Sequence, residues 1–227
     1  MRPTRTPVAS RGARRGWLPV GLIGLGVLAA CTAPTLSLRP APRAFTARDY
    51  ETVYRAWTRQ SDAFSFARLA DVLHVTATFQ SWEQRWAYVV RYAEDHGLST
   101  EERDRMLRAS LEDARAHHRF FVTLAGEYVR ESDLTDARSA WRVLLLDDRG
   151  NATVPVAIEK VDRPTAADRT YYPTIGRHRL AFRLAFAARR PDGTSTLPDD
   201  TSRATLRFTG PRGTVDLVWE LSSAGVR

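Results

Sequence analysis

Apolar residues in the first half of the chain recur with helical spacing. Tyr50, Val53, Tyr54 and Trp57 lie at i, i+3, i+4 and i+7, which places them on one face of a helix. Thr46 and Asp49 have the spacing of a capping box, so this helix is predicted to begin there and to end near Gln60.

Two further helical patterns follow one another closely. The first carries Trp82, Trp86, Val89, Val90 and Ala93 and ends at Gly97, a residue type that favours helix C-termini. The second begins at the capping-box pair Ser99 and Glu102. Its apolar face is Met106, Leu107, Leu111 and Ala114. The two helices are predicted to form a hairpin around Gly97.

Elsewhere the apolar period is two, which indicates strands. The alternating segments lie near residues 73–79, 120–128, 141–145, 154–158, 180–186, 203–208 and 215–221. Each has one apolar and one polar face, as in two sheets that each bury one side. The pattern predicts an α+β protein, an antiparallel β-sandwich of about seven strands with an N-terminal helix and a helical hairpin inserted after the first strand. An immunoglobulin-like arrangement is one option, and the pattern does not fix the pairing order.

One predicted strand contains a proline. Asp147 to Asn151 form a turn, after which Val154, Val156 and Ile158 are predicted to point inward. Pro155 cannot donate a ladder hydrogen bond, so this strand is predicted to lie at an edge or to carry a bulge.

The N-terminus has the organisation of a signal peptide. Residues 1–16 are rich in arginine, and residues 17–30 are apolar but shorter than the roughly 20 residues of a membrane span. Leu28-Ala29-Ala30-Cys31 resembles the lipobox of bacterial lipoproteins. The resemblance implies cleavage before Cys31 and acylation of that cysteine; the alternative is an ordinary secretory signal that ends at a chance cysteine.

The resemblance divides the chain into three parts. Residues 1–30 are the predicted signal peptide, residues 31–44 the acylated cysteine and a proline-rich tether, and residues 45–227 one α+β domain. That domain is helical over 45–117 and β-rich over 118–221. Prolines at positions 34, 40 and 42 favour an extended tether.

The sequence leaves two export pathways open and gives one signal for the target membrane. Arg14-Arg15-Gly16-Trp17-Leu18 is similar to a degenerate twin-arginine signal, so this route stays open beside the general secretory one. Thr32 stands where an aspartate would imply retention in the inner membrane, so the lipobox resemblance favours the outer membrane.

The formal net charge of +8 does not predict nucleic-acid binding. Residues 1–30 carry five arginines and no acid, and from Asp49 onward basic and acidic residues are equal in number. Phosphate-backbone binding draws on clustered cations, and a balanced domain offers no such excess.

Catalytic and metal motifs are missing from the sequence. Cys31 is the only cysteine, and the five histidines do not have zinc-ligand spacing. His117 and His118 are neighbours at a helix-to-strand junction and are predicted to point apart. No G-x-S-x-G, P-loop or G-x-G-x-x-G motif occurs.

Six residues are weak ligand candidates. Asp147, Asp148, Asp199 and Asp200 could supply carboxylates to Ca²⁺ or to a hydrolase at one end of the sandwich, although acidic residues also simply form turns. Tyr171 and Tyr172 could stack on sugar rings, although covering the sandwich edge is the simpler interpretation.

These observations favour a non-enzymatic lipoprotein that binds another envelope component or contributes to an assembly. The capped helix, helical hairpin and strand-rich second half resemble uncharacterised envelope lipoproteins of high-GC Gram-negative bacteria. A Ca²⁺- or glycan-binding module and an envelope hydrolase are the alternatives. Apart from the lipid on Cys31, no cofactor is expected; the expected partners are the membrane and an envelope protein.

Acylation of Cys31 is directly testable. We expect mass spectrometry of the membrane-bound protein to show an N-terminal Cys31 carrying fatty-acyl chains, because two or more chains are needed for stable anchoring. A processed protein that leaves the membrane with an unmodified thiol would contradict the lipoprotein assignment.

Overall fold

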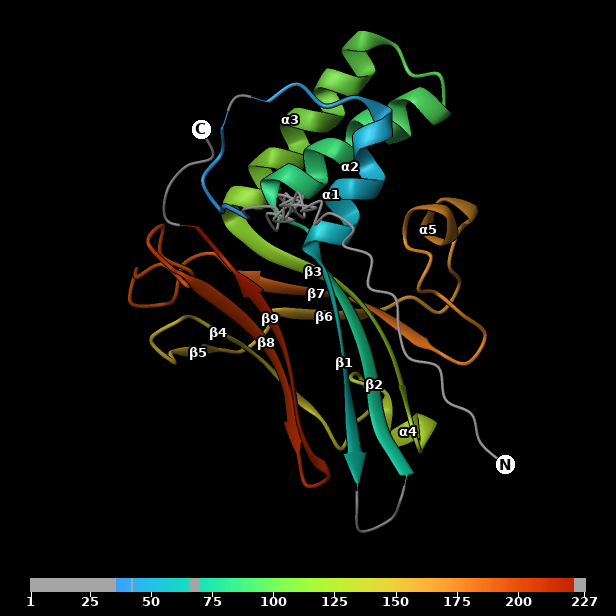
Figure 1. Cartoon of the computed structure of the whole chain (residues 1–227), viewed down its shortest axis with the longest axis vertical. Coiled ribbons are helices and arrows are strands. Elements are labelled where there is room, and N and C mark those ends of the chain that lie inside the picture. Colours follow the sequence, from blue (N-terminus) through green and yellow to red (C-terminus); the bar gives the residue numbers. More distant parts are fainter. Residues whose placement is uncertain (1–35, 42, 66–69, 223–227) are drawn as a thin grey trace, which may run out of the picture. The chain divides into compact units, whose positions relative to one another are not determined.

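The computed structural model describes residues 36–41, 43–65 and 70–222, all within one compact unit. Two antiparallel sheets form its centre (Figure 1). In strand order, the five-stranded sheet comprises β1 (Thr58–Ser65), β2 (Ala70–Phe79), β3 (His117–Gly126), β7 (Leu180–Ala187) and β6 (Ala157–Lys160). The four-stranded sheet comprises β5 (Ala152–Thr153), β4 (Arg142–Leu146), β8 (Arg203–Gly210) and β9 (Gly213–Glu220).

Six helical elements accompany the sheets in the described residues. They are the 3-10 helix η1 (Ala47–Asp49) and the α-helices α1 (Tyr50–Trp57), α2 (Trp82–Asp95), α3 (Thr100–Ala116), α4 (Val129–Ser132) and α5 (Ala166–Tyr171). The first three α-helices gather at one end of the sheets (Figure 1). The α+β prediction is therefore confirmed, with an N-terminal helix and a helical hairpin between β2 and β3.

The strand order has an immunoglobulin-like pattern. From β2 onward, the orders β2-β3-β7-β6 and β5-β4-β8-β9 correspond to the immunoglobulin orders A-B-E-D and C′-C-F-G. Every pair is antiparallel, as that arrangement requires. β1 is an additional edge strand, and the α2–α3 hairpin is inserted in the first connection of the sandwich.

The predicted strand at residues 154–158 is wrong in one respect. The chain leaves the four-stranded sheet after β5 and joins the five-stranded sheet as β6, with Pro155 between them. Val154 and Val156 were predicted to point inward but are 49% and 60% exposed. The edge position predicted from Pro155 is confirmed, since β5 and β6 are both edge strands.

The sequence pattern also missed β1. Helix α1 ends at Trp57 rather than near Gln60, because Thr58 already has extended backbone angles (φ −102°, ψ 136°). The polar β1 sequence has no clear period, but it pairs with β2 along its length. Arg59 Nε also donates to the carbonyl of Val218 in β9 at 2.9 Å. Long-range pairing therefore decides the conformation of this segment.

The structure contains the predicted α2–α3 hairpin, with the predicted helix ends. Ser81 caps α2, and the capping box of Ser99 and Glu102 begins α3. Gly97 has φ +61°, a left-handed conformation that glycine adopts without steric cost.

Aromatic rings fill the core beneath the hairpin. Phe79 stacks on Phe120 with 4.5 Å between ring centroids, and Trp219 from the other sheet lies 5.4 Å from Phe120. Trp57 meets Phe79 edge-on at 5.5 Å. Trp57 and Trp219 are fully buried. One ring cluster thus joins both sheets and α1.

The described part of the predicted tether is packed on the domain. Leu36 forms a parallel bridge with Leu221, and both Leu36 and Ser37 are buried. The carbonyl of Ser37 accepts a hydrogen bond from Trp82 Nε1 at 3.0 Å. The predicted tether is therefore packed against the domain at Leu36 and Ser37, whereas Arg39, Pro40 and Ala44 are exposed. Cys31, the signal peptide and the first tether residues lie outside the described residues.

A glycine in β8 provides a test of the sandwich packing. A Cβ atom at Gly210 would lie 1.8 Å from the backbone oxygen of Ala140, so Gly210→Ala must displace backbone. We expect a loss of about 1–3 kcal/mol in the free energy of unfolding. The control is Gly176→Ala, whose Cβ would meet nothing within 4 Å. Equal stability of the two variants in urea denaturation would contradict this packing.

Candidate functional site

Asp147 is the centre of a hydrogen-bonded turn. Its Oδ1 accepts from the backbone N–H of Arg149 at 3.0 Å and of Asn151 at 2.8 Å, and its Oδ2 accepts from Asn151 Nδ2 at 2.7 Å. Burial raises the pKa of this carboxyl, but the hydrogen bonds, those of Asn151 foremost, outweigh burial and hold the pKa below its usual value. Asp147 therefore stabilises its own loop as a carboxylate.

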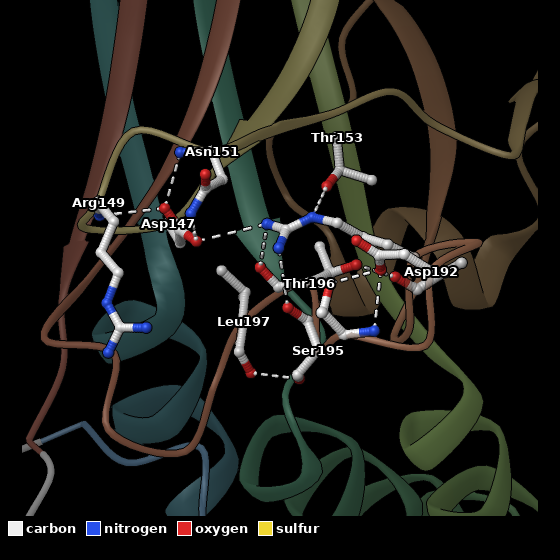
Figure 2. Close-up of polar contacts among 11 residues, drawn as sticks. Asp147, Arg149, Asn151, Thr153, Asp192, Ser195, Thr196 and Leu197 are labelled. Atoms are coloured by element: carbon white, nitrogen blue, oxygen red, sulfur yellow. Dashed lines mark hydrogen bonds and ion pairs between the residues drawn. The ribbon is translucent and has the colours of Figure 1, made fainter.

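Arg190 fastens this turn to the loop that follows β7. Its guanidinium donates to Asp147 Oδ2 at 3.3 Å, to Thr153 Oγ1 at 3.3 Å, and to the carbonyls of Ser195 and Thr196 at 3.1 and 3.2 Å. Figure 2 shows the acceptors converging from the two loops. The Arg190 guanidinium therefore holds the backbone of residues 195 and 196 next to the Asp147 turn.

The other three predicted carboxylates, Asp148, Asp199 and Asp200, do not share one site. Asp148 Oδ2 accepts from the N–H and hydroxyl of Ser202 at 2.8 and 2.9 Å, and Asp200 pairs with Arg149 at 2.8 Å. Asp199 instead lines a cavity described below. The described residues contain no group of three or more histidine, cysteine or acidic side chains arranged to hold a metal. The three carboxylates at the loops have intramolecular partners, and the Ca²⁺ site stays a prediction.

Tyr171 and Tyr172 are buried, 2% and 6% exposed. The Tyr172 ring stacks on Phe121 with 4.0 Å between centroids, and the Tyr171 hydroxyl donates to Asp95 at 2.9 Å. The sugar-stacking role predicted as one option is therefore wrong in this structure, because neither ring presents a face to solvent. Tyr172 covers β3 of the five-stranded sheet, and Tyr171 packs against α1 and α2.

A cavity that the sequence did not predict lies under the α2–α3 hairpin. Its volume is about 270 Å³. Four separate segments build it: residues 38–40, 79–86, 111–118 and 188–199. Its apolar lining residues include Leu38, Phe79, Trp82, Trp86, Leu111 and Leu197.

The polar residues that line the cavity are Gln80, Ser81, Arg115, His117, His118, Ser195 and Asp199. Of these, His118 is the one next to the aromatic core. It lies on the same face of β3 as Phe120, which is buried in the sandwich, and its ring meets Phe79 edge-on at 6.0 Å. Its Nε2 is buried and has no hydrogen-bond partner among the described residues. Burial, with smaller effects of the positive Arg85 and of His117, lowers the pKa of His118 to about 4. The imidazole is therefore neutral near pH 7.

The neighbouring His117 also lines the cavity and contacts α3. Its Nδ1 lies 3.1 Å from Asp113 Oδ1 in α3. Arg85 from α2 and Arg119 from β3 also bind Asp113, at 2.6 and 2.7 Å. Burial opposes ionisation of Asp113, but the bonds from Arg119 and Arg85 hold its pKa well below the usual range. This cluster fixes the hairpin over β3 and keeps the cavity roof in place.

Local sequence patterns could not reveal the cavity, because its walls come from distant segments. Trp82 and Trp86 were interpreted as core positions of a helix. The adjacent pair His117 and His118 was the one available signal, since alternation in a strand places one of them on the core side.

Comparisons with known proteins add little. No family model matches the chain, and no curated protein matches it in sequence. A crystal structure of a protein of unknown function from Burkholderia pseudomallei is similar at 13% identity, covering 78% of this chain and 90% of that chain with a TM-score of 0.31. A likeness at this level carries no argument about function. Among the described residues, no helix is long and apolar enough to cross a membrane.

The buried His118 predicts a pH dependence of stability. The unfolded chain takes up a proton below its usual pKa of about 6.5, whereas the folded chain does so only near pH 4. Stability should therefore fall as the pH drops from about 6.5 to 4, by on the order of 3 kcal/mol.

The variant His118→Phe should lose this contribution, which urea denaturation at several pH values would measure. The exposed His178 provides the control, and His178→Asn should keep the wild-type slope. An unchanged slope in His118→Phe would show that this imidazole is not the responsible group.

Proposed function

We propose that this chain is a lipid-anchored binding protein of the cell envelope, without catalytic activity, and that its ligand is a compact, mostly apolar molecule. The observation that carries the proposal is the cavity under the α2–α3 hairpin, with its aromatic lining and the unpartnered Nε2 of His118. Apolar pockets with a few convergent polar groups are the usual form of small-molecule sites.

The volume limits the size of the ligand. A cavity of about 150 Å³ lined by apolar side chains binds benzene. A space of about 270 Å³ fits a molecule of roughly two fused rings or an equally short branched chain. A whole lipid or an oligosaccharide exceeds this space.

The polar lining defines the chemistry of the ligand further. A neutral imidazole offers one donor and one acceptor, so His118 suits a hydroxyl, carbonyl or amine on an otherwise apolar molecule. A formal charge next to Phe79 and Trp82 would lose its hydration, whereas the charged Arg115 and Asp199 also line the cavity and could pair with a polar group of the ligand.

The lipid anchor in this proposal rests on the lipobox resemblance. Cys31 precedes Leu36 by five residues, and five extended residues span at most about 18 Å. Since Leu38 and Pro40 line the cavity, an acylated Cys31 would hold the ligand site close to the membrane surface.

Filling the cavity tests the proposal. Indole and naphthalene should raise the melting temperature of the purified protein, because a ligand that binds only the folded state stabilises it by about 2.7 kcal/mol at 100 times its Kd. The variant Ala114→Trp places a large ring in the cavity wall and should abolish this rise.

The matched control is Ala109→Trp, on the exposed side of the same helix, which should respond as the wild type does. A rise that persists in Ala114→Trp would place the probe elsewhere. If neither compound stabilised the folded wild-type protein, the small-molecule proposal would fall, and binding of an envelope protein would become the favoured role.

A further inference from the structure

A second depression lies at the other end of β7. The cavity includes Ala188, the residue directly after β7, whereas this depression includes Leu180 and Ala181 where the strand begins. It has a volume of about 500 Å³ and lies between the end of β6, helix α5 and the loop that precedes β7.

Positive charge is concentrated in this depression. Lys160, Arg169, Arg177 and Arg179 line it, and Asp162 is the one acidic residue in the lining. This contrasts with the whole sequence after residue 48, in which acidic and basic residues balance. The local excess is therefore a feature of the fold and not of overall composition.

Two of the four cations are free to bind a ligand. The side chains of Arg169 and Arg177 are exposed and have no ion pair or hydrogen bond within the described part of the chain. Lys160 is shared between Asp133 at 2.7 Å and Asp162 at 3.3 Å. On the four-stranded sheet, by contrast, Arg203 and Arg207 pair with Glu220 and Asp216 across the strands.

The frame of the depression is held from several sides. Asp168 of α5 binds Arg183 of β7 at 2.7 Å, and its capping box with Thr165 begins the helix. The buried Tyr171 ends α5 within the aromatic cluster. Arg179 donates to the hydroxyl of Thr76 in β2 at 3.2 Å, which orients its guanidinium. A fixed frame reduces the entropy lost when a ligand binds.

We propose that this depression binds a phosphate group. Guanidinium groups donate in a planar fork that matches two phosphate oxygens, and an ammonium group adds a point charge. Arg169 and Arg177 supply the free forks, Arg179 a third that is already oriented, and Lys160 the point charge. The phosphate can belong to a soluble compound or to a lipid headgroup, since both present the same oxygens.

Calorimetry with pyrophosphate on the full chain tests the proposal. We expect binding that weakens at least tenfold in the double variant Arg169→Gln/Arg177→Gln and that weakens with added salt. The variant Arg108→Gln removes an exposed arginine from α3 and should bind as the wild type does. Circular dichroism checks that each variant is folded.

Absence of pyrophosphate binding, or equal binding by the wild type and the folded double variant, would overturn the proposal. Short-chain soluble lipids distinguish the source of the phosphate. Tighter binding of dihexanoyl phosphatidic acid than of pyrophosphate, with no binding of dihexanoyl phosphatidylcholine, would support a headgroup, and the reverse order would support a soluble compound. The result is independent of the cavity, because Ala114→Trp leaves these four cations unchanged.

Discussion

A buried chain of hydrogen bonds through Trp57 connects the four-stranded sheet, α1, α2 and the N-terminal segment. Trp219 Nε1 in the four-stranded sheet donates to the carbonyl of Trp57 at 2.9 Å, and Trp57 Nε1 donates to Glu83 Oε2 in α2 at 2.8 Å. The other oxygen of Glu83 binds Arg43 in the N-terminal segment. Glu83 is 7% exposed, and a carboxylate removed from water must keep its partners. Both indole donors are also satisfied, as buried tryptophans require. The position of α2, and with it the cavity roof, thus depends on this chain of contacts.

The sequence predicted those elements whose local pattern agrees with their final environment. The α2–α3 hairpin and β7, β8 and β9 have clear periods and turn residues such as Gly97, and the structure has them at those places. The hydrophobic pattern gave wrong predictions where contacts between distant segments determine the conformation. β1 is polar and becomes a strand by pairing with β2, and the change of sheets at Pro155 exposes two valines that alternate like core residues. The prediction of ligand residues was limited for the same reason. The sequence shows which residues are acidic or aromatic, but not which partners the fold places beside them.

Asp147 and Arg190 illustrate how a residue that resembles a ligand can be structural. Loops at the end of a sandwich must satisfy their own buried backbone groups, and a carboxylate and a guanidinium do this with several bonds each. Elsewhere in the described residues, six buried side-chain polar atoms have no hydrogen-bond partner, and His118 Nε2 is one of them. His118 is the residue among these six that lines the cavity, and Arg169 and Arg177 have no counter-ion among the described residues. The cavity includes Ala188 directly after β7, and the depression includes Leu180 and Ala181 at its start, so the two proposed sites lie near opposite ends of this strand.

The bridge between Leu36 and Leu221 has a geometric consequence. It brings the entry and exit of the domain to the same edge, beside the first turn of α2, where Trp82 contacts Ser37. The turn between β8 and β9 lies at the opposite end of the sheets from α1, α2 and α3 (Figure 1). A segment fused after Leu221 would therefore start beside Leu36 at the helical end, far from that turn.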